Sequence, residues 1–510
     1  MSTPFRKFIG AVIAAVVLIG AVAPAIGEDF DNPKAKKPPR AKPMRRTAAE
    51  GMPPLPLPAT PLRRSEKKRE PAPPALVGWI NFSEKQFRIV DGERQPVEAF
   101  PTTQIDIEKL IHFANVRLNI RYRFIPTNLE KFSWDPTELP LLYLTGWTPM
   151  PPLSDPMIEK LRRYLYDGGT LVVHAQCGRQ EFIDSAQREI VRIFPDRPLA
   201  RVDGDSPLFY SYFPIDKMRV RKDAEPFVAR EPNLWAVNLG CRPAIIFSPV
   251  DLNCGWDVVN NPIQGGILYH QDDACRLGVN IITCVLANFE YARSWGTEKL
   301  YHQQDKDTRD QLVIAQIVHS GDWDPTPHAL PTLMKYIQEN TTLNVQFKRE
   351  MVDLADVDVF KHPVLYLTGL RDFKFSDQEV ARLQRYLASG GVLIADAASG
   401  RAGFDAAFRR EIQRVLPKAE LKRLDLNSPL YQMPYQIRTV DYSEIVKAQD
   451  PALNAPSLEG IMIDGQLCVI YSQFSLSNGW EQLPYAYNRG YADADSLRLG
   501  VNIFAYALTH

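Results

Sequence analysis

The sequence predicts an α/β protein with two tandem, doubly wound domains, each built on a mainly parallel sheet. One observation is that six segments recur in the same order, about 222 residues apart, along a chain of 510 residues. The other is that each copy alternates short apolar strands with amphipathic helices. Alternation of this kind is typical of a parallel sheet with helices on both faces. A chain of this length is also too long for one ordinary domain.

The repeat is visible in short segments that match closely. The matching pairs are LLYLTG (141–146) with VLYLTG (364–369), LRRYL (161–165) with LQRYL (383–387), YLYDGGTLVVHAQCGR (164–179) with YLASGGVLIADAASGR (386–401), SPLF (206–209) with SPLY (428–431), FSPVDLNCGWD (247–257) with YSQFSLSNGWE (471–481), and RLGVNI at 276–281 and 498–503. The period is far too long for a solenoid. We therefore expect two duplicated domains, over residues 76–300 and 301–510.

The second copy predicts its elements most clearly. Strands are expected where apolar residues gather between turn residues, and helices where the apolar positions recur every three or four residues. The expected strands are 311–318, 343–347, 364–369 and 391–396, and the expected helices follow Ser376 and cover 404–416. Ser376 and Glu379 form a capping-box pattern at the start of the first of these helices. Gly390 and Gly391 are expected to end it, since glycine accepts a left-handed backbone.

The N-terminus has the parts of an export signal. Arg6 and Lys7 precede an uncharged apolar run over residues 8–27, with small residues near its end. This pattern is typical of a secretory signal peptide, and the run is also close to the roughly 20 residues that span a bilayer. We expect residues 1–27 to be a signal peptide or an N-terminal anchor. Either alternative predicts a periplasmic or secreted protein, and a retained segment would anchor it in the membrane.

Residues 28–75 are predicted to be a disordered linker, because they combine three Pro-Pro pairs with basic clusters. Through Ala75 the chain has 14 basic and 6 acidic residues, so the remainder must be acidic, since the net charge is zero. A nucleic-acid reader would have its positive charge on the folded part, so no nucleic-acid partner is expected. The linker is either a solvated tether or a contact to an anionic membrane surface.

His174 and Cys177 follow a buried strand of the first copy. Ligands of doubly wound sheets bind at the carboxyl ends of strands, so a thiol here could be a nucleophile with histidine as its base. The second copy has Asp396 and Ser399 at the matching positions. Because the reactive atoms change while the neighbouring glycines are kept, we expect Cys177 to be a small turn or core residue.

Tryptophan–acid pairs recur after a glycine in both copies. A carboxylate beside an aromatic ring could hold a sugar or a cation; the alternative is a buried indole that fixes a loop. The expected ligand-binding residues are Trp147, Asp251, Trp256, Asp257, Asp396, Ser399, Trp480 and Glu481. Asn280 and Asn502 are expected to satisfy buried backbone groups. No cofactor and no metal site is expected, since the trio His270, Asp272 and Asp273 has no counterpart in the second copy.

The cysteines lie mainly in the first copy, and none forms a C-x-x-C motif, which argues against a zinc or thioredoxin-like motif. Export makes disulfides feasible. Cys275 and Cys284 lie nine residues apart on one expected helix, roughly 13 Å, which is too far for a bond. A bond between Cys241 and Cys254 stays open.

The pattern LYLTG, then S-D-x-x-x-x-x-L-x-x-Y-L-x-x-G-G, then NGWE and RLGVNI resembles the DUF4159 family of bacterial domains. The resemblance covers nearly all of 310–510 and, more loosely, 84–289. It implies a fold similar to class I glutamine amidotransferases and flavodoxin-like domains, and it implies no established activity. The family often has Gly-His after the first core strand, where this chain has Gly146-Trp147 and Gly369-Leu370. An acidic residue usually ends the glycine-glycine strand; it is kept as Asp396 and replaced by His174.

Two functions from different classes follow. The first, which we favour, is a non-catalytic cell-envelope module that binds an envelope protein or a glycan through its strand-end loops. The alternative is a cysteine-dependent hydrolase or amidotransferase-like enzyme that uses Cys177 with His174, its second copy being degenerate.

Overall fold

The computed structural model describes residues 72–80, 85–90, 93–98, 105–129, 135–257, 265–295, 311–341, 346–482 and 484–509. The expected signal segment and almost all of the basic linker lie outside these residues. Within the described part of the chain, no helix is both long and apolar enough to cross a bilayer.

The first half is built on a seven-stranded sheet with the order β4-β1-β5-β6-β11-β10-β7. Its strands are β1 (Ala75–Ile80), β4 (Arg123–Thr127), β5 (Leu141–Gly146), β6 (Thr170–Ala175), β7 (Ala200–Arg201), β10 (Trp235–Leu239) and β11 (Arg242–Ser248). Neighbours from β4 to β11 are parallel, and β10 and β7 extend the sheet in antiparallel fashion. A hairpin of β2 (Lys85–Val90) and β3 (Glu93–Glu98) and a small sheet of β8 (Met218–Lys222), β9 (Val228–Arg230) and β12 (Ile267–Tyr269) complete the strands.

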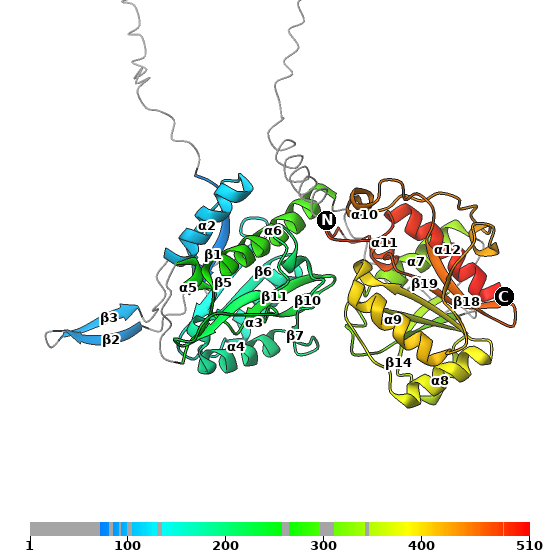
Figure 1. Cartoon of the computed structure of the whole chain (residues 1–510), viewed down its shortest axis with the longest axis horizontal. Helices are drawn as coiled ribbons and strands as arrows, with labels where there is room; N and C mark the ends of the chain where they lie inside the picture. The colour runs from blue at the N-terminus through cyan, green and yellow to red at the C-terminus, as the bar shows by residue number, and fades with distance from the viewer. Residues whose placement is uncertain are drawn as a thin grey trace, which may run out of the picture. The chain divides into compact units, whose positions relative to one another are not determined.

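Helices cover both faces of this sheet (Figure 1). One face packs α3 (Asp155–Tyr166) and α4 (Gln180–Ile193) in a single apolar cluster with the strands. On the other side α2 (Ile105–Leu118), α5 (Asn253–Trp256) and α6 (Gln271–Trp295) contact one another. Short 3-10 turns, η1 (Gln176–Gly178) and η2 (Pro207–Phe209), follow β6 and β7.

The second half has the same strand order, β14-β13-β15-β16-β19-β18-β17. Its strands are β13 (Gln311–Ile317), β14 (Gln346–Val352), β15 (Val364–Gly369), β16 (Val392–Ala397), β17 (Lys422–Arg423), β18 (Leu458–Ile463) and β19 (Gln466–Ser472). Its helices are α7 (Ala329–Asn340), α8 (Asp377–Ala388), α9 (Ala402–Val415), α10 (Glu444–Gln449), α11 (Ser477–Glu481) and α12 (Asp493–Thr509), with 3-10 turns η3 (Val357–Lys361), η4 (Ala398–Gly400) and η5 (Pro429–Tyr431). The predicted tandem α/β architecture is confirmed.

Alternate residues of the central strands enter opposite cores, because successive side chains of a strand point to opposite faces. In β16, Val392 and Ile394 join the cluster that contains α7 and α12, whereas Leu393 and Ala395 join the cluster that contains α8 and α9. Continuous apolar runs such as VLYLTG are therefore buried on both faces, as is usual in parallel sheets. The strand expected at 343–347 overlaps β14, which runs from Gln346 to Val352 and includes exposed Met351, while residues 343–345 lie outside the described part of the chain.

Helix α8 begins and ends as its sequence predicts. Ser376 accepts the backbone N–H of Glu379 at 3.3 Å, and Glu379 accepts the N–H of Ser376 at 2.6 Å, which completes the capping box. Gly390 has a φ of 92°, the left-handed conformation that glycine adopts without strain.

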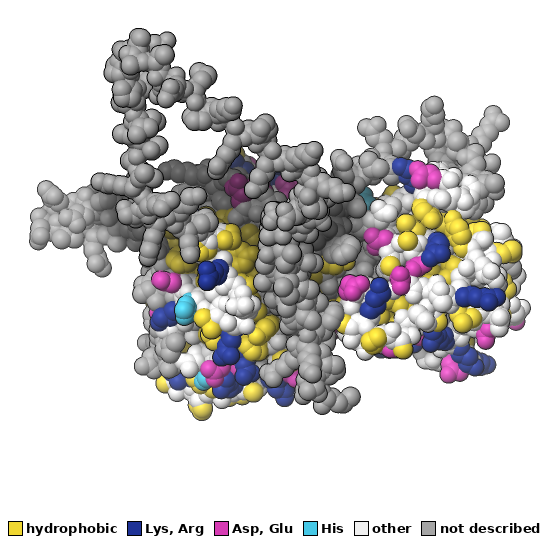
Figure 2. Space-filling model, turned by 90° about the horizontal axis from the view of Figure 1, so that it is seen from above, with side chains coloured by type: hydrophobic (Ala, Val, Ile, Leu, Met, Phe, Trp, Pro, Cys, Tyr) yellow, Lys and Arg dark blue, Asp and Glu magenta, His cyan; other side chains and the backbone are white. Residues whose placement is uncertain are grey.

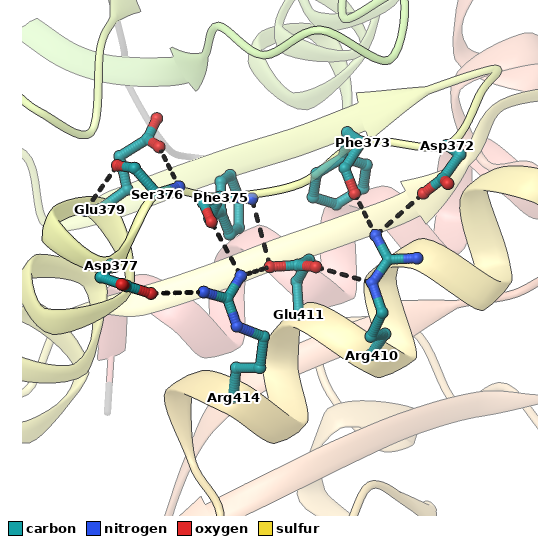
Figure 3. Close-up of polar contacts among 9 residues, drawn as sticks. All are labelled: Asp372, Phe373, Phe375, Ser376, Asp377, Glu379, Arg410, Glu411 and Arg414. Carbon is teal, nitrogen blue, oxygen red and sulfur yellow. Dashed lines mark hydrogen bonds and ion pairs between the residues drawn. The ribbon is translucent and has the colours of Figure 1, made fainter.

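A buried carboxylate joins α9 to the segment that leads into α8 (Figure 3). Glu411 is 1% exposed and accepts the backbone N–H of Phe375 at 3.2 Å and Nε of Arg410 at 2.8 Å, and it also pairs with Arg414. The first half repeats this arrangement: Glu189, 2% exposed, accepts the N–H of Leu153 at 3.0 Å and pairs with an arginine one turn later. Burial with several donors makes this carboxylate a structural element of both halves.

We predict that Glu411→Gln lowers the free energy of unfolding by about 2 kcal/mol, because the change removes the charge of a buried, multiply bonded acid. Urea denaturation of the full chain measures the effect. Asp377→Asn is the matched control, since Asp377 contacts the same Arg414 but is fully exposed, and it should leave the unfolding midpoint unchanged. Equal effects of the two variants would contradict the structural role of Glu411.

Candidate functional site

The turn after the fourth parallel strand has the same unusual backbone in both halves. Cys177 has a φ of 51° and Ser399 a φ of 52°, and the following glycines, Gly178 and Gly400, have φ values of 62° and 61°. A left-handed residue other than glycine costs on the order of 1 kcal/mol, so other contacts must hold it. In the first half the N–H of Cys177 donates to the carboxylate of Asp251, and in the second the N–H of Ser399 donates to Oδ1 of Asn478 at 2.9 Å.

His174 is fully buried at the end of β6, and hydroxyl groups occupy both of its ring nitrogens. Nε2 lies 2.6 Å from the hydroxyl of Tyr143, and Nδ1 lies 3.4 Å from that of Thr145. Burial lowers the pKa of His174 to about 3, so the ring is neutral at physiological pH. With both nitrogens engaged, His174 is not arranged as the base of a Cys177 nucleophile.

Asp396 occupies the place in the second half that His174 occupies in the first. His174 pairs with Thr145 in the sheet register, and Asp396 pairs with Thr368 in the same way. Each also bonds the tyrosine of the neighbouring strand, since the hydroxyl of Tyr366 donates to Asp396 at 2.6 Å. The other oxygen of Asp396 accepts three hydrogen bonds from the start of α11, at 2.9 to 3.0 Å. Its bonds are all internal.

Asp106 extends the buried polar cluster around His174, although nothing in the sequence distinguished it. It lies in α2, is 2% exposed, and accepts the hydroxyl proton of Tyr143 at 3.2 Å. Burial raises the pKa of Asp106 to about 6, and hydrogen bonds from the Ile107 N–H and Asn253 partly offset this rise. In the sequence it is one of two acids in the first turn of α2, and nothing separates it from exposed Glu108.

The tryptophan–acid pairs do not form binding platforms. Trp256 and Trp480 are 3% and 0% exposed, and each indole N–H donates to a carbonyl of the following long helix, Ala274 at 2.9 Å and Ser496 at 2.8 Å. The expectation that these rings stack on a ligand is therefore wrong: the rings are buried and join α5 to α6 and α11 to α12.

The two acids of these pairs have partners inside their own halves. Asp257 forms an ion pair with Lys109 at 2.5 Å, and Glu481 accepts the backbone N–H of His328 at 3.0 Å. Both acids therefore join neighbouring elements of their own half.

The prediction for the two asparagines of RLGVNI is confirmed. Asn280 donates to the carbonyls of Leu208 and Phe213, and Asn502 makes the equivalent bonds in the second half.

Trp147 differs from the other two expected tryptophans, because its ring is only half-buried. It follows β5, and the guanidinium carbon of Arg179 lies 4.5 Å from the ring centroid. Thr148 and Pro149 beside it are exposed. The loops after β5 and β6 thus present an aromatic ring and a cation together at the strand ends of the first half.

The thiol of Cys177 lies in a cluster with two other potential metal ligands. Its Sγ, the carboxylate of Asp251 and Sγ of Cys254 all lie within 4.8 Å of one another. The neighbouring Cys177 thiol raises the pKa of Cys254, and burial raises the pKa of Asp251. No disulfide joins the cysteines of the described residues, so the Cys241–Cys254 bond that the sequence left open is not formed, and Cys254 instead contacts Cys177.

The trio His270, Asp272 and Asp273, which has the composition of a metal site, is engaged in ion pairs. Asp272 and Asp273 both bind the guanidinium of Arg219, at 3.2 and 2.9 Å, and Asp272 lies 3.5 Å from Nδ1 of His270. These carboxylates form ion pairs, which is their structural role here. The cluster around Cys177 was missed because no C-x-x-C motif marks it; its signal was the spacing Asp251-x-x-Cys254 on an expected loop.

We predict that the first half loses stability in acid because of His174. Its folded pKa of about 3 lies below the unfolded value of 6.5, so the unfolded state binds the proton first as pH falls. The stability is complete above pH 6.5 and is lost progressively below it, by roughly 3 kcal/mol at pH 4. His174→Gln should remove this part of the pH dependence in urea denaturation at pH 7 and pH 4. An unchanged slope would show that another group titrates.

Comparison with known proteins identifies the family. The family model described as "Domain of unknown function (DUF4159)" matches residues 102–286 and 313–508. A search of curated proteins found no match. Among solved structures, an alpha-L-fucosidase isoenzyme 2 from Paenibacillus thiaminolyticus aligns over 86% of this chain and 84% of that chain at 10% identity, with a TM-score of 0.20, which is too low to carry an argument. The two family matches cover most of the chain, so this protein belongs to the DUF4159 family and contains two tandem copies of its domain.

Proposed function

We propose that this chain is a non-catalytic interaction module of the cell envelope, which binds an envelope protein or a glycan through the strand-end loops of its first half. The proposal rests on the burial and the internal hydrogen bonds of the polar side chains at the strand ends. His174 and Asp396, the residues best placed for chemistry, are buried and engaged by internal hydrogen bonds. A site that served catalysis would keep such groups within reach of a substrate.

The loops that remain accessible have the composition of a binding surface. Trp147 and Arg179 lie side by side, and tryptophan and arginine are the side chains most enriched at energetic centres of interfaces. The ring offers apolar area, and the guanidinium offers fixed donors for a carboxylate or a sugar hydroxyl. The second half has Leu370, 3% exposed, after the equivalent strand, so the surface is specific to the first half.

The export pattern and the charge distribution support a location in the cell envelope. The apolar run over residues 8–27 and the basic linker over 28–75 suit a protein tethered outside the cytoplasm, with the linker either solvated or against an anionic surface. On the face that Figure 2 shows, basic and acidic side chains of the described residues are interspersed. This mixture supports the expectation of no nucleic-acid partner.

The strand order also supports the wider fold resemblance. Counted along the chain, the five mutually parallel strands of each main sheet are arranged 2-1-3-4-5, which is the order of flavodoxin-like sheets. We therefore propose a flavodoxin-like or glutamine amidotransferase-like fold without the corresponding chemistry.

We predict that Trp147→Ala lowers the yield of a partner crosslinked in intact cells by roughly tenfold or more, because an interface centre contributes about 2 kcal/mol. Val116→Ala is the control, because it removes a side chain that is 67% exposed elsewhere on the same half, and it should keep the partner. Full capture by Trp147→Ala would contradict the proposed surface. A Cys177-dependent hydrolytic activity of the purified chain would instead favour the enzyme alternative.

A further inference from the structure

We propose that the first half contains a metal site, in which Cys177, Asp251 and Cys254 bind one zinc ion through two thiolates and a carboxylate. The three ligand atoms lie within 4.8 Å of one another, although Cys177 is separated from the other two by more than 70 residues of chain. The three residues belong to one half and lie directly after β6 and at the start of α5. The site is independent of the proposed function.

The backbone directs all three side chains toward one point. Asp251 is fully buried, and each of its oxygens accepts one N–H, from Cys177 and from Cys254, the latter at 2.9 Å. A carboxylate oxygen has two lone-pair directions, so each oxygen keeps one for a metal ion. The N–H donors orient the carboxylate as outer partners orient the ligands of known metal sites.

The second half supplies an internal comparison. Its residues at the three positions are Ser399, Ser475 and Asn478, within a backbone of the same design. Ser399 donates its N–H to Asn478 at 2.9 Å, the hydroxyl of Ser475 donates to the same Oδ1 at 2.8 Å, and Asn478 donates its N–H to Ser475 at 3.2 Å. A neutral hydrogen-bonded cluster fills this place.

At all three positions the first half has residues that can ligate a metal, where the second half has neutral ones. Serine corresponds to Cys177, serine to Asp251, and asparagine to Cys254. One replacement of this kind would mean little. Three at positions that meet in space, on a frame that works with neutral residues, indicate a shared purpose for the two thiols and the acid.

The ligand set selects the metal. Thiolates favour zinc over magnesium or calcium, which prefer oxygen ligands. Zinc–sulfur bonds of about 2.3 Å place tetrahedral ligands roughly 3.8 Å apart, so a 4.8 Å cluster needs to contract only slightly. Three protein ligands leave a fourth position for water or an external ligand. Cys254 is partly exposed, which gives an ion a route into the site.

Two buried oxygens adjoin the cluster in sequence. Oε1 of Gln176 and Oδ1 of Asn253 precede Cys177 and Cys254, and in the described structure neither has a hydrogen-bond partner. Buried acceptors without partners are uncommon and mark places where water or an ion binds.

The direct test is zinc binding by the purified full chain, kept reduced and free of oxygen. The experiment measures bound zinc by elemental analysis after dialysis, and the absorption of a cobalt-substituted sample for sulfur-to-metal charge transfer. We expect one zinc per chain and a cobalt spectrum with two thiolates. The triple variant Cys177→Ser, Asp251→Ser, Cys254→Asn copies the second half, so it should fold, and it should bind zinc more than about 100-fold more weakly.

Cys275→Ser controls for the loss of a thiol outside the cluster and should bind zinc like the original chain. The proposal is overturned if the reduced chain binds no zinc, if the triple variant binds it equally, or if cobalt shows no thiolate band. A Cys177–Cys254 disulfide that persists in the reduced preparation also overturns it. None of these results bears on capture of a partner through Trp147, so the two proposals fail separately.

Discussion

The turn at the site depends on a hydrogen bond donated by the backbone N–H of the second residue after the fourth parallel strand. In the first half it runs from Cys177 to Asp251, and in the second from Ser399 to Asn478, which matches Cys254, so the donor is equivalent in the two halves and the accepting side chain is not. This bond holds a non-glycine residue in a left-handed conformation and directs its side chain toward the loop before a short helix. The position is thereby set by the backbone, and the side chain that occupies it can change without loss of the turn.

A second position also keeps its backbone and its hydrogen-bond partner in both halves while the side chain changes. Position 174 and position 396 differ in charge and shape, yet each residue bonds the tyrosine of the neighbouring strand. Asp396 accepts the proton of its tyrosine, whereas Nε2 of His174 lies 2.6 Å from a tyrosine hydroxyl that donates to Asp106. The buried glutamate of α4 and α9 and the buried indole before α6 and α12 are the same in both halves, and they make equivalent hydrogen bonds.

The sequence predicted much of the fold because its signals are local or repeated. The capping box at Ser376, the buried strand VLYLTG and the duplication were confirmed, since each depends on spacing along the chain. The strand expected to end at 347 continues to Val352, because polar and apolar residues alternate in this edge strand and also suit a loop. Burial of Trp256 stayed one of two alternatives because composition cannot distinguish a ring buried under a helix from one exposed at a loop.

The cluster around Cys177 was missed for a related reason. Sequence motifs for zinc require ligands close together in the chain, whereas here β6 and the loop before α5 bring together residues far apart in it. Comparing the two copies at all three positions would have revealed the change from serine, serine and asparagine. In a duplicated chain, the second copy shows that the same backbone forms with neutral residues, and the first copy shows which side chains differ from them.

The two halves share a backbone frame and differ in the side chains that the turn after the fourth parallel strand brings together. Diffraction from crystals of the zinc-loaded full chain, recorded on both sides of the zinc absorption edge, tests it most directly. The account predicts an anomalous peak between Cys177, Asp251 and Cys254, none at Ser399, Ser475 and Asn478, and left-handed turns in both halves. A peak in both places or in neither, or two turns of different backbone conformation, would contradict it.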